Sequence, residues 1–390
     1  MSSSPLLITR DEPFVALLER HARAREVALD CEFHGEKRYR PTLYLVQIGF
    51  AEEAVAVDPQ RVDLRPLRAM LEDEAVRKVF HAGREDVRLL SRATGATDVP
   101  GIFDTQVAAA FLGHGLSIGY GRLVKELLGV ELDKSNQFTD WSRELTSEQI
   151  DYALNDVRFL PRVTALLAAD LERRGRLAWA LDASHAMSRT ALTEPDKRKL
   201  FRKISGSASL GAVELGTLRE LAIWRDGIAE SENCRPESVV SDAGLRQLAL
   251  RPPAKQGQLR GMRGVGMGGS ERWWASLREA VARGIADPEP VTPFAEQDLR
   301  AEAIAALLGV VRRVVATTND VAAELLASSA ELRALAEWQL GARKEPAPAI
   351  DALTGWRESL IGAPLLDALD GKVAVKVAAG TDAGLELVPG

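Results

Sequence analysis

The chain has very little cysteine, with 2 residues in 390, Cys31 and Cys234. They stand far apart and form no C-x-x-C pair, which argues against a disulfide scaffold and against a structural zinc site. Long apolar runs are also missing: no uninterrupted stretch could span a bilayer, and the first residues lack the basic leader and apolar run of a secretory signal. We therefore expect a soluble, cytoplasmic protein that does not enter a membrane.

A surplus of basic residues is missing as well. The formal net charge is −6, from 50 Lys and Arg against 56 Asp and Glu. Because contacts with phosphates use Lys and Arg, this balance is unfavourable for a nucleic-acid-binding protein. It does not exclude one, since an enzyme that holds its substrate through divalent metals gathers acidic residues at one place, and a local basic patch can coexist with an acidic total.

The rest of the composition is that of an ordinary globular protein, with 46% apolar and 27% charged residues. The length predicts two or three compact units rather than one. We expect a first domain over residues 1–205 that ends in the basic linker EPDKRKLFRK. We expect a second domain over 206–288 and a third over 289–390, separated by the proline-rich segment DPEPVTP.

The first of these units alternates β-branched runs with helical patterns, which predicts an α/β domain. Five strands are expected: Glu26 to Phe33, Leu43 to Phe50, Ala54 to Asp58, Lys78 to Ala82 and Gly101 to Thr105. The connections between the first three are too short for crossover helices, so these strands should form an antiparallel meander, with the later strands added through helices into a mixed sheet. From about Gly206 onward amphipathic helices dominate, and both later units are expected to be all-α.

The segment VALDCEFHG places Asp30 and Glu32 two residues apart in a predicted strand. Side chains alternate across a strand, so both carboxylates project from one face, with Cys31 and Phe33 on the other. Two adjacent acids repel each other unless a cation lies between them, and all-oxygen ligands suit Mg²⁺ or Mn²⁺ rather than zinc. An exposed strand face is the alternative, but the apolar flanking residues are typical of a buried central strand.

The segment KVFHAGREDVRLL runs from a strand through a tight turn at Gly83 into a helix that carries Asp86. Strand ends at such turns are where α/β sheets bind ligands. An Asp in the first turn of a helix is by itself usually a surface residue favoured by the helix dipole, so this signal is weak alone. We expect His81 to be a hydrogen-bonded wall residue rather than a metal ligand, because the chain offers no companion His at metal-binding spacing.

The segment LTSEQIDYALNDVRFL opens with Thr146 and Gln149 at the spacing of a capping box and continues as an amphipathic helix. Tyr152 and Asp156 are four residues apart and so share one helix face, beside the apolar stripe. In isolation this pair is interpreted as a surface hydrogen bond. Pro161 is expected to kink or end the helix.

In this order along the chain, the three segments resemble the DEDD exonuclease superfamily, in the subgroup that carries a tyrosine. More narrowly, the ribonuclease D family is similar over about residues 26 to 170, through the segments LDCEF, TLYLVQIG, FHAGREDV, FDTQVAAAFLG, LDKSNQFTDW and LTSEQIDYALNDVRFL. The chain departs from that pattern at Cys31, where threonine is common, and between Trp141 and Thr146, where one expected basic residue is missing. The resemblance implies a ribonuclease H-like fold and an exoribonuclease that shortens RNA from its 3′ end, with a role in trimming tRNA precursors or other structured small RNAs.

The resemblance also implies a catalytic site. It assigns Asp30, Glu32, Asp86 and Asp156 as ligands of two divalent metal ions, Mg²⁺ or Mn²⁺. It implies that the hydroxyl of Tyr152 orients or helps to deprotonate the attacking water. The product would be a nucleoside 5′-monophosphate. A phenol with a pKa near ~10 is a poor base at neutral pH, so positioning of the water is the expected role.

Contacts with the substrate are expected from a wider set: Phe33, His34, His81, Lys134, Gln137 and Trp141. For two of these residues the hydrophobic core is an open alternative. Strand parity favours the core for Phe33, and for Trp141 the two locations are about equally favoured. Asp104, in IFDT, is expected only to cap the helix that follows it.

The helical units carry a second resemblance. LRELAIWRDGIAESEN, SDAGLRQLALRPP and QLRGMRGV resemble an HRDC module, a small helical nucleic-acid-binding domain. LLASSAELRALAEW and LTGWRESLIGAPLLDAL are similar to the second, divergent HRDC-like domain at the carboxyl end of ribonuclease D. Trp224 and Trp356 are expected to pack in helical cores rather than to stack on bases.

The second unit also holds the densest basic set of the chain: Arg251, Lys255, Arg260, Arg263 and Arg272. We expect these residues to hold RNA phosphates behind the 3′ end, with a solvated helix face as the alternative. The expected partner is RNA with a free 3′ end. Two rival functions stay open, a DNA exonuclease of the same catalytic class and an inactive binding protein with the same fold. A monomer is expected, because no dimerisation heptad is evident.

Overall fold

The computed structural model describes residues 7–35, 37–133, 139–262, 264–265, 272–291 and 298–390. Contacts between residues divide the chain into two compact units: the first holds Met1–Glu32, Leu43–Thr193 and Gln297–Gly390, and the second holds Phe33–Thr42 and Glu194–Glu296. Within the described ranges, no helix combines the length and the apolar character that crossing a membrane requires.

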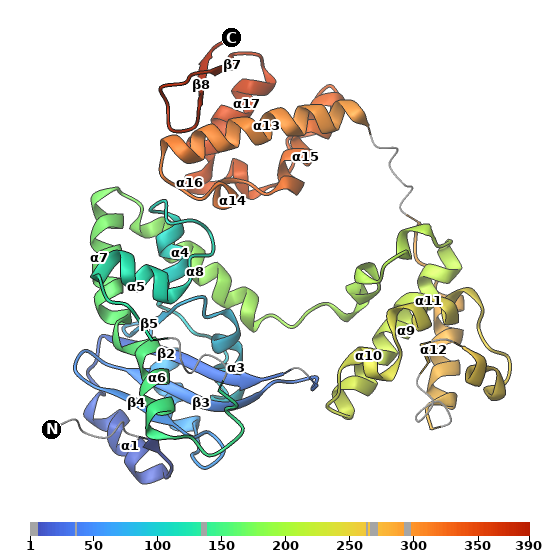
Figure 1. Ribbon diagram of the computed structural model, residues 1–390. Helices are drawn as coiled ribbons and strands as arrows, with labels where there is room; N and C mark the ends of the chain where they lie inside the picture. The colour runs from blue at the N-terminus through green and yellow to red at the C-terminus, as the bar shows by residue number, and fades with distance from the viewer. Residues whose placement is uncertain (1–6, 36, 134–138, 263, 266–271, 292–297) are drawn as a thin grey trace. The chain divides into compact units, whose positions relative to one another are not determined.

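A six-stranded mixed sheet forms the centre of the first unit (Figure 1). Its strands, in the spatial order β1-β4-β3-β2-β5-β6, are β1 (Leu7–Ile8), β2 (Glu26–His34), β3 (Thr42–Gly49), β4 (Ala54–Val57), β5 (Arg77–Phe80) and β6 (Ile102–Asp104). β3 and β4 pair antiparallel, whereas β5 pairs parallel with both β2 and β6. The five strands expected from the sequence are confirmed, and within this sheet only the two-residue edge strand β1 was not predicted.

The position of β2 in the sheet explains its sequence. It lies between β3 and β5, and Val27, Ala28 and Leu29 are completely buried. A strand covered on both faces needs such a continuous apolar run. Because β2, β5 and β6 are parallel, their carboxyl ends lie at the same edge of the sheet, which is where open α/β sheets bind ligands.

Helices connect and cover these strands (Figure 1). They are α1 (Asp11–Arg20), α2 (Arg68–Glu72), α3 (Arg84–Thr94), α4 (Thr105–Ala110), α5 (Tyr120–Leu128), α6 (Ser147–Arg158), α7 (Leu160–Arg173) and α8 (Leu177–Leu192). The expected capping box of Thr146 and Gln149 begins α6. The expected break is also present: α6 ends at Arg158, and Pro161 stands in the first turn of α7, where its missing N–H costs nothing.

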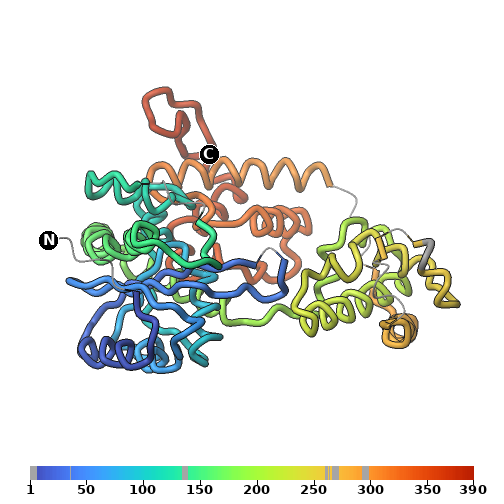
Figure 2. Tube along the Cα trace, turned by 60° about the horizontal axis from the view of Figure 1, so that its bottom comes forward, coloured from blue at the N-terminus to red at the C-terminus, as the bar shows by residue number. Residues whose placement is uncertain are grey.

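The carboxyl-terminal region belongs to the first unit. Its helices, orange to red in Figures 1 and 2, are α13 (Leu299–Thr318), α14 (Ala323–Leu326), α15 (Ser329–Leu340), α16 (Gly355–Arg357) and α17 (Ala363–Leu369). The Ala322 N–H donates to the carbonyl of Ala110 at 2.9 Å, and the rings of Trp179 and Trp356 stack with centroids 4.9 Å apart. Trp356 therefore packs against the core, as expected.

The all-α expectation is wrong for the end of the chain. β7 (Val373–Val377) and β8 (Leu385–Pro389) form an antiparallel hairpin after α17. Neither strand has a fully buried face, so its sequence does not need a clear alternation of apolar and polar residues. Two short strands with little core contact are difficult to predict from such a pattern.

The second unit is helical. Its main helices are α9 (Ala212–Ser231), α10 (Pro236–Val239), α11 (Asp242–Leu250) and α12 (Trp274–Ala286). α9 and α12 approach backbone to backbone, since a Cβ on Gly216 would lie 2.6 Å from the carbonyl oxygen of Gly284. Trp224 is buried in this core and donates from Nε1 to Ser276 Oγ at 3.0 Å, which confirms its packing role.

The stretch EPDKRKLFRK differs from the expected exposed linker. It contains the 3-10 helix η2 (Lys197–Lys203), and Phe201 and Ile204 are buried in the core of the second unit. Lys197 Nζ lies 2.8 Å from a carboxylate oxygen of both Asp226 and Glu230. The charges dominate the sequence pattern, but the apolar residues between them decide the packing.

Candidate active site

Three of the predicted ligands meet at one place in the first unit. Asp30, Glu32 and Asp156 each contribute a carboxylate oxygen, and these oxygens lie within 4.8 Å of one another. Asp30 and Glu32 come from β2 and share a face, as strand parity requires, whereas Asp156 comes from α6. The three side chains are half-buried, so the cluster is open to a ligand on one side.

The fourth predicted ligand, Asp86, lies beside this cluster rather than within it. It stands in the first turn of α3 and is 7% exposed. Its charge raises the pKa of both Asp30 and Glu32, so its carboxylate is a near neighbour. Burial raises the pKa of Asp86, and the thiol and backbone N–H of Cys31 lie close enough to lower it in part, so the residue at the position where threonine is common still places a donor beside Asp86.

Burial shifts all four carboxyl groups toward the neutral form, and repulsion from neighbouring carboxylates adds to the shift for Asp30 and Glu32. Burial raises the pKa of Glu32 to about 8 and the pKa values of Asp86 and Asp156 to about 7. For Asp30 burial is again the largest cause, and the neighbouring carboxylates raise its pKa further, well above the usual range. Four acids packed in this way are stable in their ionised form only next to positive charge.

Gln47 is a buried polar residue of the site whose side chain lacks hydrogen-bond partners in the described part of the chain. This residue of β3 is fully buried, and neither of its amide atoms makes a hydrogen bond of normal length to a described residue. Its side chain is near enough to Glu32 to lower the pKa of that carboxyl. An unpartnered buried amide beside repelling carboxylates fits an all-oxygen site for a hard divalent cation.

Tyr152 stands one helical turn before Asp156 on α6 and is half-buried. Burial, followed by the charge of Asp156, raises the pKa of its phenol. The hydroxyl is therefore neutral at neutral pH and can donate and accept hydrogen bonds, but it is a poor base. The aromatic ring packs against the small core formed by Leu45, Trp141 and Ile150 with their neighbours.

A tight turn after β5 precedes Asp86, and it consists of His81, Ala82 and Gly83. His81 Nδ1 lies 2.9 Å from Thr105 Oγ1, and Nε2 lies 3.0 Å from the carbonyl of Ile118. Burial lowers the pKa of His81, and a carbonyl can only accept, so the neutral ring carries its proton on Nε2. His81 is thus the hydrogen-bonded wall residue that we expected, with both ring nitrogens engaged.

The other predicted substrate contacts have different surroundings. Phe33 and His34 continue β2 and are half-buried. Trp141 is 8% exposed and packs in the core, and it also lines a pocket of about 510 Å³ together with Tyr44 and Arg61. The core location predicted for Trp141 is confirmed, and its contact with the substrate stays a prediction, because none of the clustered carboxylates lines that pocket. Lys134 and Gln137 lie outside the described residues.

Sequence reasoning missed two residues that contact this site. Gln47 lies in TLYLVQIG, and an amide inside an otherwise apolar strand is itself a sign of a polar site. Tyr120 is the second, because its hydroxyl donates to the carbonyl of Asn155 at 3.0 Å. The charge of Asp156, after burial, raises the pKa of Tyr120, so the two side chains are neighbours. Nothing in the local pattern around Tyr120 indicates this contact.

The basic set of the second unit is only partly described. Arg251 and Lys255 are exposed, and Arg272 forms an ion pair with Glu232 at 2.7 Å. Arg263 and the side chain of Arg260 lie outside the described residues. A hollow of about 400 Å³ on α11 is lined by Ala243, Arg246, Gln247, Leu250 and Arg251.

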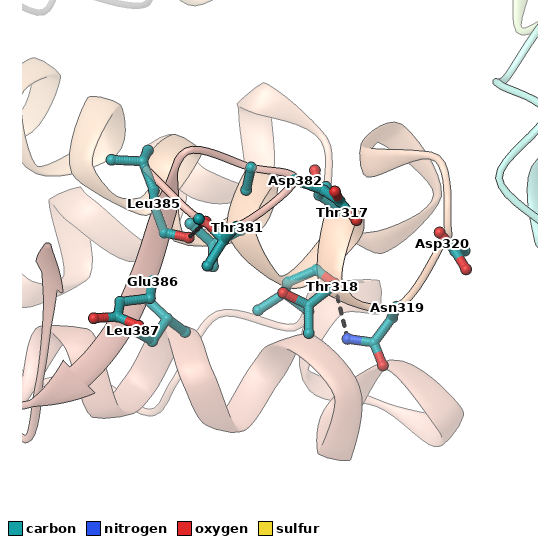
Figure 3. Close-up of a pocket in the computed structure, with 13 residues that line it drawn as sticks. Thr317, Thr318, Asn319, Asp320, Thr381, Asp382, Leu385, Glu386 and Leu387 are labelled. Atoms are coloured by element: carbon teal, nitrogen blue, oxygen red, sulfur yellow. Dashed lines mark hydrogen bonds between the residues drawn. The ribbon is translucent and has the colours of Figure 1, made fainter. Parts of the chain in front are cut away.

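A hollow of about 610 Å³ in the first unit lies elsewhere, between the end of α13 and the β7–β8 hairpin (Figure 3). Thr318 and Asn319 form one wall, and Asn319 Nδ2 donates to the carbonyl of Val315 at 2.8 Å. Asp382 and Glu386 add acidic groups from the hairpin. None of the predicted catalytic carboxylates lines it. The described residues of its lining include no basic one, and Glu386 is already paired with Lys376, so the hollow is unfavourable for phosphates.

Comparisons with known proteins agree with this geometry. A family model described as 3′-5′ exonuclease matches residues 6–172, and one described as HRDC domain matches residues 214–281. Ribonuclease D of Gluconacetobacter diazotrophicus is 36% identical over 381 residues, which cover 96% of this chain and 95% of the relative. Ribonuclease D of Zymomonas mobilis is 36% identical over 390 residues, which cover 96% of each chain.

A solved structure extends the similarity to three dimensions. The crystal structure of Escherichia coli RNase D, described as an exoribonuclease involved in structured RNA processing, matches with a TM-score of 0.81 and 30% identity. The match covers 94% of this chain and 99% of that one. With relatives this similar over nearly their whole length, the chain belongs to the ribonuclease D family and is a 3′-5′ exoribonuclease.

Proposed function

We propose that the enzyme hydrolyses RNA from its 3′ end by two-metal-ion catalysis and releases nucleoside 5′-monophosphates. The observation that carries this proposal is the meeting of Asp30, Glu32 and Asp156 within 4.8 Å, with Asp86 beside them. These four carboxylates would hold two ions of Mg²⁺ or Mn²⁺. When bound, such ions lower the pKa of a water and compensate the charge that develops on the phosphate.

The protein's own groups would do the rest. Tyr152 orients the attacking water through a neutral hydroxyl, so its contribution is position rather than proton removal. Gln47 lies near Glu32, and its buried amide would be free to bond to that carboxylate or to a metal-bound water once an ion is held. Together they would hold the water and one ligand in the geometry for in-line attack.

The substrate contacts that we propose come from both the catalytic part and the helical part of the chain. Phe33, His34, His81 and Trp141 would meet the terminal nucleotides, with Lys134 and Gln137 added from the segment before α6. For His81 the ring face is the part left for such a contact, because both nitrogens are bonded within the protein. In the helical part, Arg251, Lys255, Arg260 and Arg263 would bind phosphates behind the 3′ end.

We also propose the finer biological context. The substrates would be tRNA precursors or other structured small RNAs, and the enzyme would act as a monomer in the cytoplasm. The division into a catalytic domain over 1–205, an HRDC domain over 206–288 and a divergent HRDC-like domain over 289–390 is proposed on the same basis. A cut at Ser205 would not isolate a working catalytic domain, because Leu308 and Val311 complete the core of the first unit.

The direct test is hydrolysis of 5′-labelled single-stranded RNA and of DNA with the same sequence. Each is incubated with Mg²⁺, with Mn²⁺ and with a chelator. We expect a descending ladder from RNA with either metal and none with chelator, and a labelled 3′ nucleotide should be released as the 5′-monophosphate. Activity that survives the chelator would contradict metal catalysis, and equal rates on DNA would favour the DNA exonuclease instead.

A further inference from the structure

Asp104, at the end of β6, receives more hydrogen bonds than a helix cap requires. It is 1% exposed, and its carboxylate accepts from the N–H groups of Gln106 at 2.9 Å and Val107 at 3.2 Å, which are the expected cap bonds of α4. It also accepts from Ala82 N–H at 3.1 Å and Gly83 N–H at 2.8 Å. The same carboxylate therefore holds the turn that follows β5.

That turn has an unfavourable backbone and needs such a tie. Ala82 has φ of 58°, in the left-handed region that residues with a Cβ rarely adopt. Gly83 has no room for a side chain, because a Cβ there would lie 2.3 Å from Phe80 Cβ. Phe80 and Asp104 are register partners in the parallel β5–β6 pair, so the sheet itself places Asp104 next to the turn.

Neighbouring residues strengthen the arrangement. Thr105 Oγ1 lies 2.9 Å from His81 Nδ1, so two consecutive residues at the start of α4 hold two consecutive parts of the turn. The backbone N–H of Asp104 donates to Ser184 Oγ at 3.1 Å, which fixes Asp104 against α8. The backbone of Asp104 is therefore fixed by α8, and its carboxylate can hold the turn at a defined position.

The turn sets the position of Asp86. α3 starts at Arg84, directly after the turn, and the Val87 N–H donates to the carbonyl of Gly83 at 2.9 Å. A shift of Gly83 therefore moves the first helical turn, on which Asp86 stands. We propose that Asp104 is a positioning residue that holds Asp86 in place for metal binding, which rests on the metal site proposed above.

One substitution separates this role from helix capping. In D104N, Oδ1 can still accept the two cap bonds and the bond from Ala82 N–H. The amide nitrogen replaces Oδ2 and faces Gly83 N–H. Because both groups are donors, the bond to Gly83 is lost. Asn is as good a helix cap as Asp. We expect a folded enzyme whose affinity for Mn²⁺, measured by calorimetry, falls about 10-fold, the scale found when groups behind metal ligands are lost. The titration is run at about pH 8, above the pKa of about 7 of Asp86, so that the lost charge of Asp104 does not change its protonation.

Two comparisons test that the effect passes through Asp86. D298N makes the same change at the cap of α13, where Asp298 accepts from Arg300 N–H, and should leave the Mn²⁺ affinity unchanged. D104N added to D86N should cause no further loss, because the ligand that it positions is already gone. A wild-type Mn²⁺ affinity in D104N, or the same loss with and without Asp86, would overturn the proposal.

A second readout does not need the metal. Amide hydrogen exchange should be faster over residues 82–87 in D104N than in D298N, and equal exchange in the two would also overturn the proposal. If the wild-type enzyme takes up no divalent ion, the proposed metal site fails while this arm still tests the turn. If D104N does not fold, T105V is used instead, because it removes the contact between Thr105 Oγ1 and His81 Nδ1. Unchanged hydrogen exchange over residues 82–87 in T105V would count against the proposal.

Discussion

The carboxylate site of the first unit and the α11 surface of the second unit use charge in opposite ways. At the first, Asp30, Glu32 and Asp156 are crowded into a half-buried cluster, and their pKa values are raised. On the second, Arg246 and Arg251 stand exposed around an open hollow, with no ion pair to another described residue. Low dielectric magnifies the first kind of interaction, while water and salt weaken the second. The acidic site should therefore respond to metal and pH, and the basic surface to ionic strength.

The largest expected effect is the loss of a single carboxylate. Asp30→Asn should lower kcat/KM by roughly 10³-fold or more, the scale seen when one preorganised charge-stabilising group is removed from an active site. The same substitution should raise the melting temperature of the metal-free protein, because it removes a buried, repelled charge. Asp151→Asn, an exposed carboxylate on the same helix as Asp156 and paired with Arg158, is the control and should change neither value by much. A metal-free protein that Asp30→Asn destabilises would contradict this account of the site.

Tyr152→Phe should have the next largest effect. The ring and its packing remain, so the fold and the calorimetric affinity for Mn²⁺ should be unchanged, while kcat falls about 10²-fold because the water is no longer oriented. Single-turnover kinetics would locate the loss in the chemical step. Tyr44→Phe, a change to a tyrosine at the same small core, is the matched control. Equal turnover in Tyr152→Phe and the wild type would remove the tyrosine from the mechanism.

The pH dependence of stability separates the two regions without any substitution. The folded-state pKa values of Glu32, Asp86 and Asp156 lie above their ordinary values, at about 8, 7 and 7. The stability that these groups contribute is complete below their unfolded pKa values and is lost as the pH rises through the folded ones. Without metal, the free energy of unfolding should thus fall by a few kcal/mol between about pH 5 and about pH 8, since one pKa unit corresponds to about 1.4 kcal/mol.

Chemical denaturation at several pH values, with and without Mn²⁺, would measure this loss. The ion binds the ionised carboxylates, so it should remove the fall or reverse it. The E32Q variant should show a shallower decline. Measurements stay below about pH 8, because burial lowers the pKa of Lys78 to about 8 and its contribution grows at higher pH. A metal-free protein whose stability rises across the range would contradict the raised pKa values.

The same contrast explains what sequence reasoning predicted well. Asp30 and Glu32 could be placed on one face because strand parity is local, and α6 could be placed because its capping box and apolar stripe are local. The approach of Asp86 to them depends on the parallel order of β2, β5 and β6, which the alternation of strands and helices suggests but does not specify. The second role of Asp104 had no local signal, because its bonds to Ala82 and Gly83 cross between strands.

Packing between distant segments was the hardest part to predict. The charges of EPDKRKLFRK predicted an exposed linker, yet Phe201 is buried in the core of the second unit. Residues 289–390 were expected to form a third domain, and nothing in the sequence indicates that Trp356 of this region stacks on Trp179 in the first unit. In both cases the residues that decide the outcome are ordinary apolar ones, and their partners lie far away in the sequence.

The smallest expected effect belongs to the α11 surface. Arg246→Ala and Arg251→Ala together should weaken binding of single-stranded RNA several-fold and reduce the slope of log K against log salt by about 1.4, because each lost phosphate contact removes about 0.7 on a single strand. The rate on saturating RNA should stay the same, since the carboxylate site is untouched. Arg283→Ala, which removes an exposed arginine of the same unit already paired with Glu220, is the control and should leave the slope unchanged. If the double variant keeps the wild-type slope, α11 is a solvated helix face. The acidic site would then still bind metal, but the α11 surface would not bind RNA.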